Sequence, residues 1–305
     1  MLKYIIKKLI LMIPVLIGMT IVIFLILHLA PGDPVHLLVG PNVTPEAYEK
    51  VSISLGLDKS STSQYFTFMG NILRGDLGIS ILQKRPVSEI IMERLPITLE
   101  LGIYALILSF VISIPLGIAA AVKRNTAIDY GAMTAALIGM SLPNFWFGLL
   151  LVYFFSYRLG WFPISGYGTW MHLVLPVIAM GLTDAAITAR MARSSMLEVI
   201  RQDYIRTARA KGLKERVVIN EHALRNALIP LITILGLRIG MIFSGSVIIE
   251  TVFSIPGIGR TMVDAIFARD FPVIQGSLLV LGACVLIANL LADVLYAVVD
   301  PRIKY

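Results

Sequence analysis

The sequence predicts an all-α membrane protein with six transmembrane helices and both termini in the cytoplasm. Of its 305 residues, 57% are hydrophobic and only 15% are charged, a composition outside the range of soluble domains. Six apolar stretches are long enough to cross a bilayer, and the lysines and arginines gather in short segments between them. Because such basic segments stay in the cytoplasm, their distribution orients the helices.

The first apolar stretch, Leu9–Leu29, contains no charged residue and follows Lys3, Lys7 and Lys8. A secretory signal peptide has a shorter apolar core followed by a cleavage site of small residues, and neither feature is present. We therefore expect residues 1–30 to form a retained N-terminal transmembrane helix.

Residues 31–96 are polar and hold six basic and seven acidic residues. The lack of a basic excess places this segment outside the cell. Since it is long for a simple connection, we expect short helices within it, around residues 45–55 and 62–73.

Five further apolar stretches follow, each able to span about 30 Å at 1.5 Å per residue. They are Ile97–Val122, Asp129–Tyr157, His172–Met191, Ala227–Ile249 and Ile274–Val299. Pro115, Pro143 and Pro176 are expected to kink or begin their helices, which membrane bundles tolerate. We expect residues 97–305 to form a five-helix core that includes a cytoplasmic loop at 192–226.

The connections between the stretches fix the predicted orientation. Lys123 and Arg124 follow the second stretch, and Arg302 and Lys304 close the chain, whereas the connection after the third stretch holds only Arg158. By the positive-inside rule, both termini lie in the cytoplasm.

The longest charged segment, residues 190–230, joins the fourth and fifth stretches and holds nine basic and four acidic residues. Gly212 divides this segment, and glycine favours helix ends over helix interiors, so two short helices are expected. The faces expected of the first helix are Tyr204, Ala208 and Leu213 on one side and Arg206 and Arg209 on the other. We interpret the segment as a docking surface beneath the helix bundle.

Arg238 is the clearest charge inside a predicted span, and an arginine at that depth must face protein or water rather than lipid. Two interpretations remain open: an ion pair with Asp184, or a polar pathway in which Arg238 meets an anionic group. Ser244, a small polar residue of the same stretch, is a further pathway candidate. Near the membrane interfaces, Glu100 and Asp293 are expected to be solvated or paired.

The segment from Glu250 to Arg260 is apolar but is interrupted by Pro256, Gly257 and Gly259. This pattern predicts a re-entrant loop or a short helix at the outer surface. Glu250 and the three interrupting residues are therefore candidates for an external gate, and an ordinary interfacial hairpin explains the pattern equally well.

The sequence shows no catalytic, metal or cofactor site. Its single cysteine, Cys284, excludes a disulfide within the chain and any cysteine metal cluster. The four histidines lack metal-ligand spacing, and the absence of a Gly-Lys dipeptide excludes a P-loop. The net charge of +7 is explained by membrane topology, so no nucleic acid partner is expected.

Two parts of the basic segment resemble the cytoplasmic loop of ABC importer permeases. Residues Asp203–Gly212 are followed by His222-Ala-Leu-Arg-Asn226, and their departures from the general loop pattern are similar to the peptide/nickel branch. Further short motifs follow in the order of that branch: Pro31–Pro34, Leu55–Asp58, Gly75–Gly78, Arg85–Val87, Pro256–Gly259, Arg269–Ile274 and Asp300–Arg302.

The resemblance implies the B-type permease subunit of a dipeptide or oligopeptide importer with the type I fold, in a bacterial or archaeal plasma membrane. It implies a second permease, two cytoplasmic ATPase subunits that bind ATP and Mg, and an external substrate-binding protein, with membrane lipid around the bundle. Nickel chelate or glutathione is the alternative substrate. An ion-coupled secondary transporter is the alternative from another class, but it would show inverted repeats. The implied coupling helix comprises Asp203, Tyr204, Arg206, Thr207, Ala208, Arg209, Lys211 and Gly212.

Overall fold

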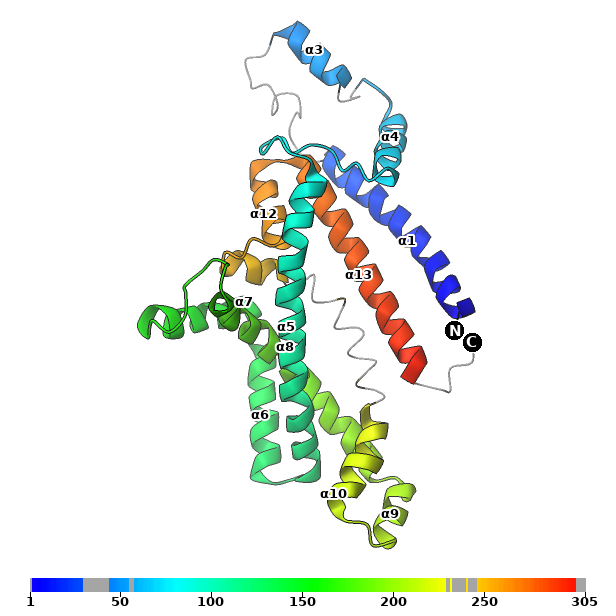
Figure 1. The fold of residues 1–305 in the computed structure, drawn as a ribbon, viewed down its shortest axis with the longest axis vertical. Helices are drawn as coiled ribbons and strands as arrows, with labels where there is room; N and C mark the ends of the chain where they lie inside the picture. The colour runs from blue at the N-terminus through cyan, green and yellow to red at the C-terminus, as the bar shows by residue number, and fades with distance from the viewer. Residues whose placement is uncertain are drawn as a thin grey trace.

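The computed structural model describes residues 2–29, 44–54, 58–228, 231, 240 and 246–299, and within these ranges the regular structure is helical. Figure 1 shows long helices running along one axis of the molecule, with short helices at both ends. The helices in chain order are α1 (Leu2–Leu29), α3 (Pro45–Ser54), α4 (Ser61–Leu73), α5 (Val87–Val122), α6 (Ala127–Ser141), α7 (Asn144–Leu151), the π-helix η1 (Val152–Arg158), α8 (Trp170–Ile200), α9 (Asp203–Ala210), α10 (Glu215–Val217), the π-helix η2 (Val218–Ala223), α12 (Ile258–Ala268) and α13 (Phe271–Val299).

Four helices, α1, α5, α8 and α13, are long and apolar enough to cross a membrane, and the bent pair of α6 with α7–η1 adds a fifth span if counted as one. The first, second, fourth and sixth predicted stretches are therefore helical. The short helices expected around residues 45–55 and 62–73 are also present, as α3 and α4.

The long helices extend beyond their predicted bounds, and the extensions of α5 and α8 change the assignment of neighbouring segments. Helix α5 begins at Val87 rather than Ile97, because Val87, Ile90 and Ile91 are buried against α12 and α13. Helix α8 continues past Met191 to Ile200, through the first part of the predicted loop at 192–226. Both extensions are amphipathic, so a search for uniformly apolar residues misses them.

The predicted third span, Asp129–Tyr157, is broken at Pro143, where a kink or a helix start was expected. The helix stops at Ser141 and restarts after Pro143, and the two parts meet at an angle of 102°. Proline lacks the N–H that would continue the helix and forces the preceding residue out of helical geometry. Leu142 accordingly has φ −91° and ψ 126°. In Figure 1, α7 and η1 extend sideways from the bundle.

Most of the predicted fifth span, Ala227–Ile249, lies outside the described residues, and Arg238 and Ser244 are among those left out. Gly240 is described, and a Cβ atom added there would lie 2.6 Å from Oδ1 of Asn289 on α13. Gly240 therefore lies against the amide end of the Asn289 side chain, which would have to move to admit a larger residue.

Helices α5 and α8 make the most extensive contact of any helix pair in the described structure. A Cβ atom at Gly117 would lie 2.5 Å from Cβ of Ala192, and one at Gly181 would lie 2.9 Å from the Ala105 carbonyl oxygen. Small residues at such contacts let two membrane helices approach closely. The pair joins two regions of the molecule: the α9 end, which holds α9, α10 and η2, and the α12 end, which holds α12 and the 159–169 loop.

Helix α1 packs against α13 and α4 at the edge of the bundle. Lys8 of α1 and Asp293 of α13 form an ion pair of 2.7 Å. Asp293, which was expected to be solvated or paired, is therefore paired. The hydroxyl groups of Thr20 and Tyr65 lie 3.0 Å apart between α1 and α4.

Candidate functional site

At the α9 end, two short helices flank Gly212, as predicted. Helix α9 ends at Ala210, and α10 begins at Glu215. Gly212 has φ +78° and donates its N–H to the Arg209 carbonyl oxygen at 2.9 Å. This left-handed conformation ends a helix and favours glycine.

Helix α9 is fixed to the molecule by Ile205 and Ala208, which are buried. They pack in a cluster that includes Met196 of α8 and Val218 of η2. Of the expected face of Tyr204, Ala208 and Leu213, Ala208 alone is buried: Tyr204 and Leu213 are 42% and 40% exposed, and Leu213 lies beyond the end of α9 at Ala210. Positions three apart share a helix face, and Ile205 is the apolar residue that this spacing pairs with Ala208.

The rest of α9 and the following turn present polar side chains to solvent. Arg209 donates two hydrogen bonds to the Glu215 carboxylate, at 3.0 and 2.6 Å. These bonds lower the pKa of Glu215 and raise that of Arg209. The exposed residues of the predicted coupling helix are Asp203, Tyr204, Arg206, Thr207, Arg209, Lys211 and Gly212.

A hydrogen bond joins the two sequence motifs of this segment. The Asn226 amide donates to the Tyr204 hydroxyl at 2.9 Å and to the His222 carbonyl oxygen at 3.2 Å. Together with Arg209 and Glu215, this contact holds α9 against the helix that follows it. The exposed polar residues of Asp203–Gly212, called the polar elbow below, thus lie on a short element that is held together by its own hydrogen bonds.

A buried ion pair joins α6 to α8 next to the elbow. Arg193 donates to both carboxylate oxygens of Asp129, at 2.5 and 2.7 Å, and the Asn125 N–H donates to the same carboxylate at 3.0 Å. Asp129 is only 2% exposed. From the sequence, Arg193 was treated only as one of the nine basic residues of segment 190–230. No local pattern identified Asp129, 64 residues away, as its partner.

At the α12 end, Glu250 is fully buried and caps the N-terminus of α12. Its carboxylate accepts hydrogen bonds from the Thr98 hydroxyl at 2.7 Å and from the Arg260 N–H at 3.0 Å. The Thr98 hydroxyl in turn accepts from the Ile258 N–H at 2.9 Å. A negative group at a helix N-terminus is favourable, because it satisfies free N–H groups and the helix dipole.

The glycines predicted for the external gate make this cap possible. A Cβ atom at Gly257 would collide with the Glu250 carboxyl group, and one at Gly259 would lie 2.6 Å from Cα of Val247. Pro256 precedes them, and its carbonyl oxygen lies 3.5 Å from Nη1 of Arg94. The structure therefore brings Gly257 and Gly259 against the buried carboxylate of Glu250, with Pro256 directly before them.

A second buried carboxylate, Asp270, fixes another part of this end and was not identified from the sequence. It accepts hydrogen bonds from the Ser80 hydroxyl at 2.5 Å and from the N–H groups of Ile81 and Leu82 at 3.1 Å. These bonds attach the turn before α5 to the junction of α12 and α13. Asp270 directly precedes α13, but that helix begins at Phe271, ahead of the predicted stretch Ile274–Val299, so the prediction did not mark Asp270 as a cap.

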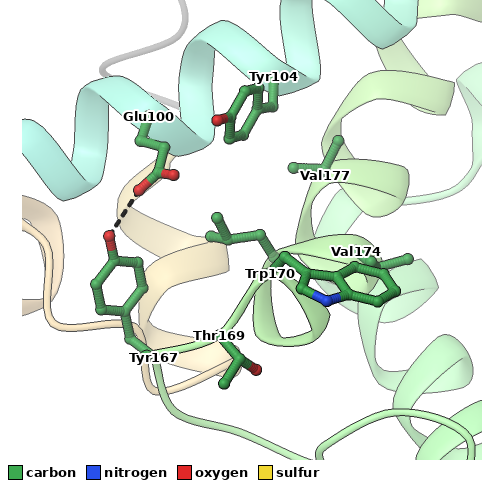
Figure 2. Close-up of a pocket in the computed structure, with 9 residues that line it drawn as sticks. Glu100, Tyr104, Tyr167, Thr169, Trp170, Val174 and Val177 are labelled. Atoms are coloured by element: carbon green, nitrogen blue, oxygen red, sulfur yellow. Dashed lines mark hydrogen bonds between the residues drawn. The ribbon is translucent and has the colours of Figure 1, made fainter.

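A cavity of about 400 Å³ opens at the α12 end between α5, the 167–169 loop and the start of α8 (Figure 2). The Tyr167 hydroxyl donates to Oε2 of Glu100 at 2.6 Å. This bond raises the pKa of Tyr167 to about 12. Glu100 is therefore paired, as expected.

The proposed ion pair between Arg238 and Asp184 is not tested by the described residues. Arg238 lies outside the described residues. The carbonyl oxygen of Asp184 accepts from the Thr188 hydroxyl at 3.0 Å within α8. In the part of the chain that the structure describes, no group of three or more His, Cys, Asp or Glu residues is placed to hold a metal ion.

Solved structures share the helical arrangement. A chain of the MetNI methionine ABC transporter, in an inward-facing conformation, aligns with a TM-score of 0.58 and 21% identity over 69% of this chain and 96% of that chain. A chain of an amino acid ABC transporter solved with histidines aligns with a TM-score of 0.52 and 16% identity, over 71% and 95%. At these identities the likeness shows the type I ABC importer permease fold and no more.

Closer relatives match along the whole chain. The oligopeptide transport system permease protein AppB of Bacillus subtilis is 45% identical, with both chains covered in full. The glutathione transport system permease protein GsiC of Pectobacterium atrosepticum is 43% identical with the same coverage. The dipeptide transport system permease protein DppB of Escherichia coli K12 is 40% identical over all of this chain and 99% of that protein.

Family models agree with these relatives. The model described as binding-protein-dependent transport system inner membrane component matches residues 113–305, and its N-terminal counterpart matches residues 1–102. The chain therefore belongs to the family of binding-protein-dependent transport system inner membrane components, and it is the membrane-embedded transport subunit of an ABC importer rather than its ATP-hydrolysing subunit.

Proposed function

We propose that this permease forms half of a translocation pathway for dipeptides and oligopeptides and that α9 is its contact with an ATPase subunit. The observation that carries the proposal is the polar elbow, which is exposed on one side and packed against α8 on the other. A push on α9 would pass through Ile205 to Met196 and so along the α5–α8 pair. The named substrates of the relatives support the cargo class, since glutathione is itself a small peptide.

The proposed assembly contains a second permease, two ATPase subunits that bind ATP and Mg, and an external binding protein, in a bacterial or archaeal plasma membrane. The basic α9 end faces the cytoplasm together with both termini, and the α12 end faces outward. Glu250, Pro256, Gly257 and Gly259 form the external gate in this proposal. Arg238, Ser244 and Asp184 are the proposed pathway residues.

The decisive test replaces Gly212 in the assembled transporter. Gly212→Val forces a β-branched residue into a left-handed conformation, whereas Gly212→Asn is a matched control because asparagine tolerates that conformation. Apart from residue 212 and its two chain neighbours, no atom of the described residues lies within 4 Å of an added Cβ atom, so the change acts on the backbone or on a partner. We expect Gly212→Val to retain ATP hydrolysis and assembly but to lose peptide uptake.

The two variants separate the possible results. Loss of uptake with valine alone assigns the effect to the turn, and loss with both variants places the ATPase surface directly on residue 212. Unchanged uptake with both variants would exclude α9 as the coupling element. Competition of uptake by dipeptide, glutathione and nickel chelate then assigns the substrate.

A further inference from the structure

The cavity in Figure 2 has the size of a site for a small molecule or for one end of a larger one. Its volume is about 400 Å³, and it lies at the end of the molecule that the proposed function places outside. The cavity plays no part in the elbow or in the Glu250 cap. A cargo that leaves the binding protein would meet this end first.

Glu100 gives the cavity its charge. Of the nine described residues that line it, Glu100 alone is charged. One carboxylate oxygen is bonded to Tyr167, and the other points away from Tyr167 into the open space beside Tyr104 (Figure 2). Among the residues that the structure describes, no lysine or arginine lies within ion-pair distance of this carboxylate.

Tyr167 holds the carboxylate without neutralising it. The bond to Glu100 raises the pKa of Tyr167 to about 12, so the hydroxyl stays protonated at neutral pH. It therefore acts as the hydrogen-bond donor to the carboxylate. A charge held in position at the edge of a partly apolar cavity attracts a cation more strongly than a freely moving surface charge does.

Aromatic rings form much of the remaining wall. Tyr104, Tyr167 and Trp170 line the cavity together with valine and leucine side chains. The faces of tyrosine and tryptophan rings attract ammonium groups, with the strongest effect at tryptophan. A carboxylate beside such rings therefore selects an organic ammonium over an anion or a neutral group.

We propose that this cavity binds an ammonium group of the peptide cargo through Glu100 and the surrounding aromatic rings. The inference rests on the proposed peptide function and adds a specificity site to it. The ammonium group belongs either to the peptide N-terminus or to a lysine side chain. Both carry the same charge and fit the same wall.

The alternative is that the Glu100–Tyr167 bond only fixes the loop to α5. Other bonds already hold this loop in place, at Phe253 and at the start of α8. The Gly166 N–H donates to the Phe253 carbonyl oxygen at 2.8 Å, and the capping box of Thr169 and His172 holds the loop at the start of α8. A bond needed only for position would also not require a charged acceptor.

The test measures binding directly, with Trp170 as the reporter. The chain has three tryptophans, so Trp146→Phe with Trp161→Phe leaves Trp170 alone in the full chain, held in lipid nanodiscs. The emission of Trp170 is measured while dialanine is added, whose only ammonium group is at the N-terminus. A second titration uses Nα-acetyl-lysine amide, whose only ammonium group is on the side chain. N-acetyldialanine, which carries neither, is the control probe.

Two variants separate charge from position. Glu100→Gln keeps an oxygen that accepts the Tyr167 bond but removes the charge, and Tyr167→Phe removes the bond but keeps the charge. We expect a saturable change with one or both ammonium probes and none with N-acetyldialanine. Binding should weaken about tenfold in Glu100→Gln, equivalent to about 1.4 kcal/mol, because the charge that attracts the ammonium group is lost, and by less than about threefold in Tyr167→Phe.

Three results would overturn the inference: no saturable change with either ammonium probe, equal binding of N-acetyldialanine, or equal weakening in the two variants. The probe that binds identifies the source of the ammonium group. Uptake by the assembled transporter separates this inference from the proposed function. Absent ammonium binding with normal peptide uptake refutes the cavity alone, whereas ammonium binding without any peptide uptake refutes the peptide function alone.

Discussion

The two ends of the α5–α8 pair use their acidic residues in opposite ways. At the α12 end, Glu250 and Asp270 are buried and accept hydrogen bonds from backbone N–H groups of this chain. At the α9 end, Asp203 and Glu215 are exposed and pair with arginines on the surface. Glu250 and Asp270 are thus held by contacts within the chain, whereas Asp203 and Glu215 stay accessible.

This difference makes the buried carboxylates of the α12 end less free to change partners than the exposed acids of the α9 end. Backbone bonds to a buried carboxylate are satisfied only in one geometry, so the α12 end is stiff. Exposed ion pairs contribute little to stability and exchange partners easily. A surface that must meet an ATPase subunit gains from such pairs, because its charges can be shared without unfolding the chain. The buried pair of Asp129 and Arg193 lies between the two cases, close to the elbow but inside the bundle.

The largest effect is expected for Arg193→Ala, which tests whether the α9 end has a stiff base. The substitution leaves the Asp129 carboxylate buried without its main partner, at a cost of about 3–5 kcal/mol. Thermal unfolding of the purified transporter measures the loss. Replacing both residues, as in Asp129→Leu with Arg193→Met, should recover much of it, because a packed apolar pair avoids the desolvation cost. A melting temperature unchanged in Arg193→Ala would show that the pair contributes nothing.

A smaller loss is expected for Glu250→Ala at the α12 end. The Thr98 hydroxyl and the Arg260 N–H would lose their acceptor in a buried site, which costs about 3 kcal/mol. The matched control is Glu89→Ala on α5, where the carboxylate is 58% exposed and its loss should be hardly measurable. Equal melting temperatures for the two variants would contradict the comparison between the ends.

Ile205→Ala addresses the attachment of α9 rather than its surface. The side chain is fully buried in the cluster beneath the elbow, and its truncation should cost about 2 kcal/mol. Since α9 is only eight residues long, this loss should loosen the helix and reduce peptide uptake per ATP hydrolysed. Ile53→Ala, at an exposed isoleucine of α3, is the control. An unchanged ratio of uptake to hydrolysis would show that Ile205 does not transmit the motion.

The sequence predicted the long elements well and the joints poorly. Apolar length alone located α1, α5, α8 and α13, because a membrane helix must be uniformly apolar. The break at Pro143 was expected only as a kink or a helix start, and the angle of 102° depends on tertiary packing that no local pattern encodes. The amphipathic first turns of α5 were assigned to the external segment, because their burial also depends on packing against other helices.

The candidate sites divide in the same manner. Gly212 and the gate glycines were found because a required backbone conformation or close approach leaves a local signal in the sequence. The partners of buried charges were missed, since Asp129 with Arg193 and Asp270 with Ser80 are 64 and 190 residues apart. Such pairs are decided by which helices pack together, and a single sequence does not contain that information.

The smallest effect concerns the surface pair of Arg209 and Glu215, and it gives the sharpest contrast with the buried carboxylates. The bonds from Arg209 lower the folded-state pKa of Glu215. The stability from this pair is therefore present above the unfolded-state pKa, near 4.5, and is lost as the pH falls through the lower folded-state value. Both side chains are more than a third exposed, so the contribution is about 0.5 kcal/mol. Amide hydrogen exchange in α9, compared between the parent and Glu215→Gln, should differ slightly at pH 7, and the difference should vanish at low pH. It should also shrink in high salt, because exposed pairs are screened. A difference that persists in acid or salt would mean that Glu215 acts from a buried position, and the contrast between an accessible end and a stiff end would no longer hold.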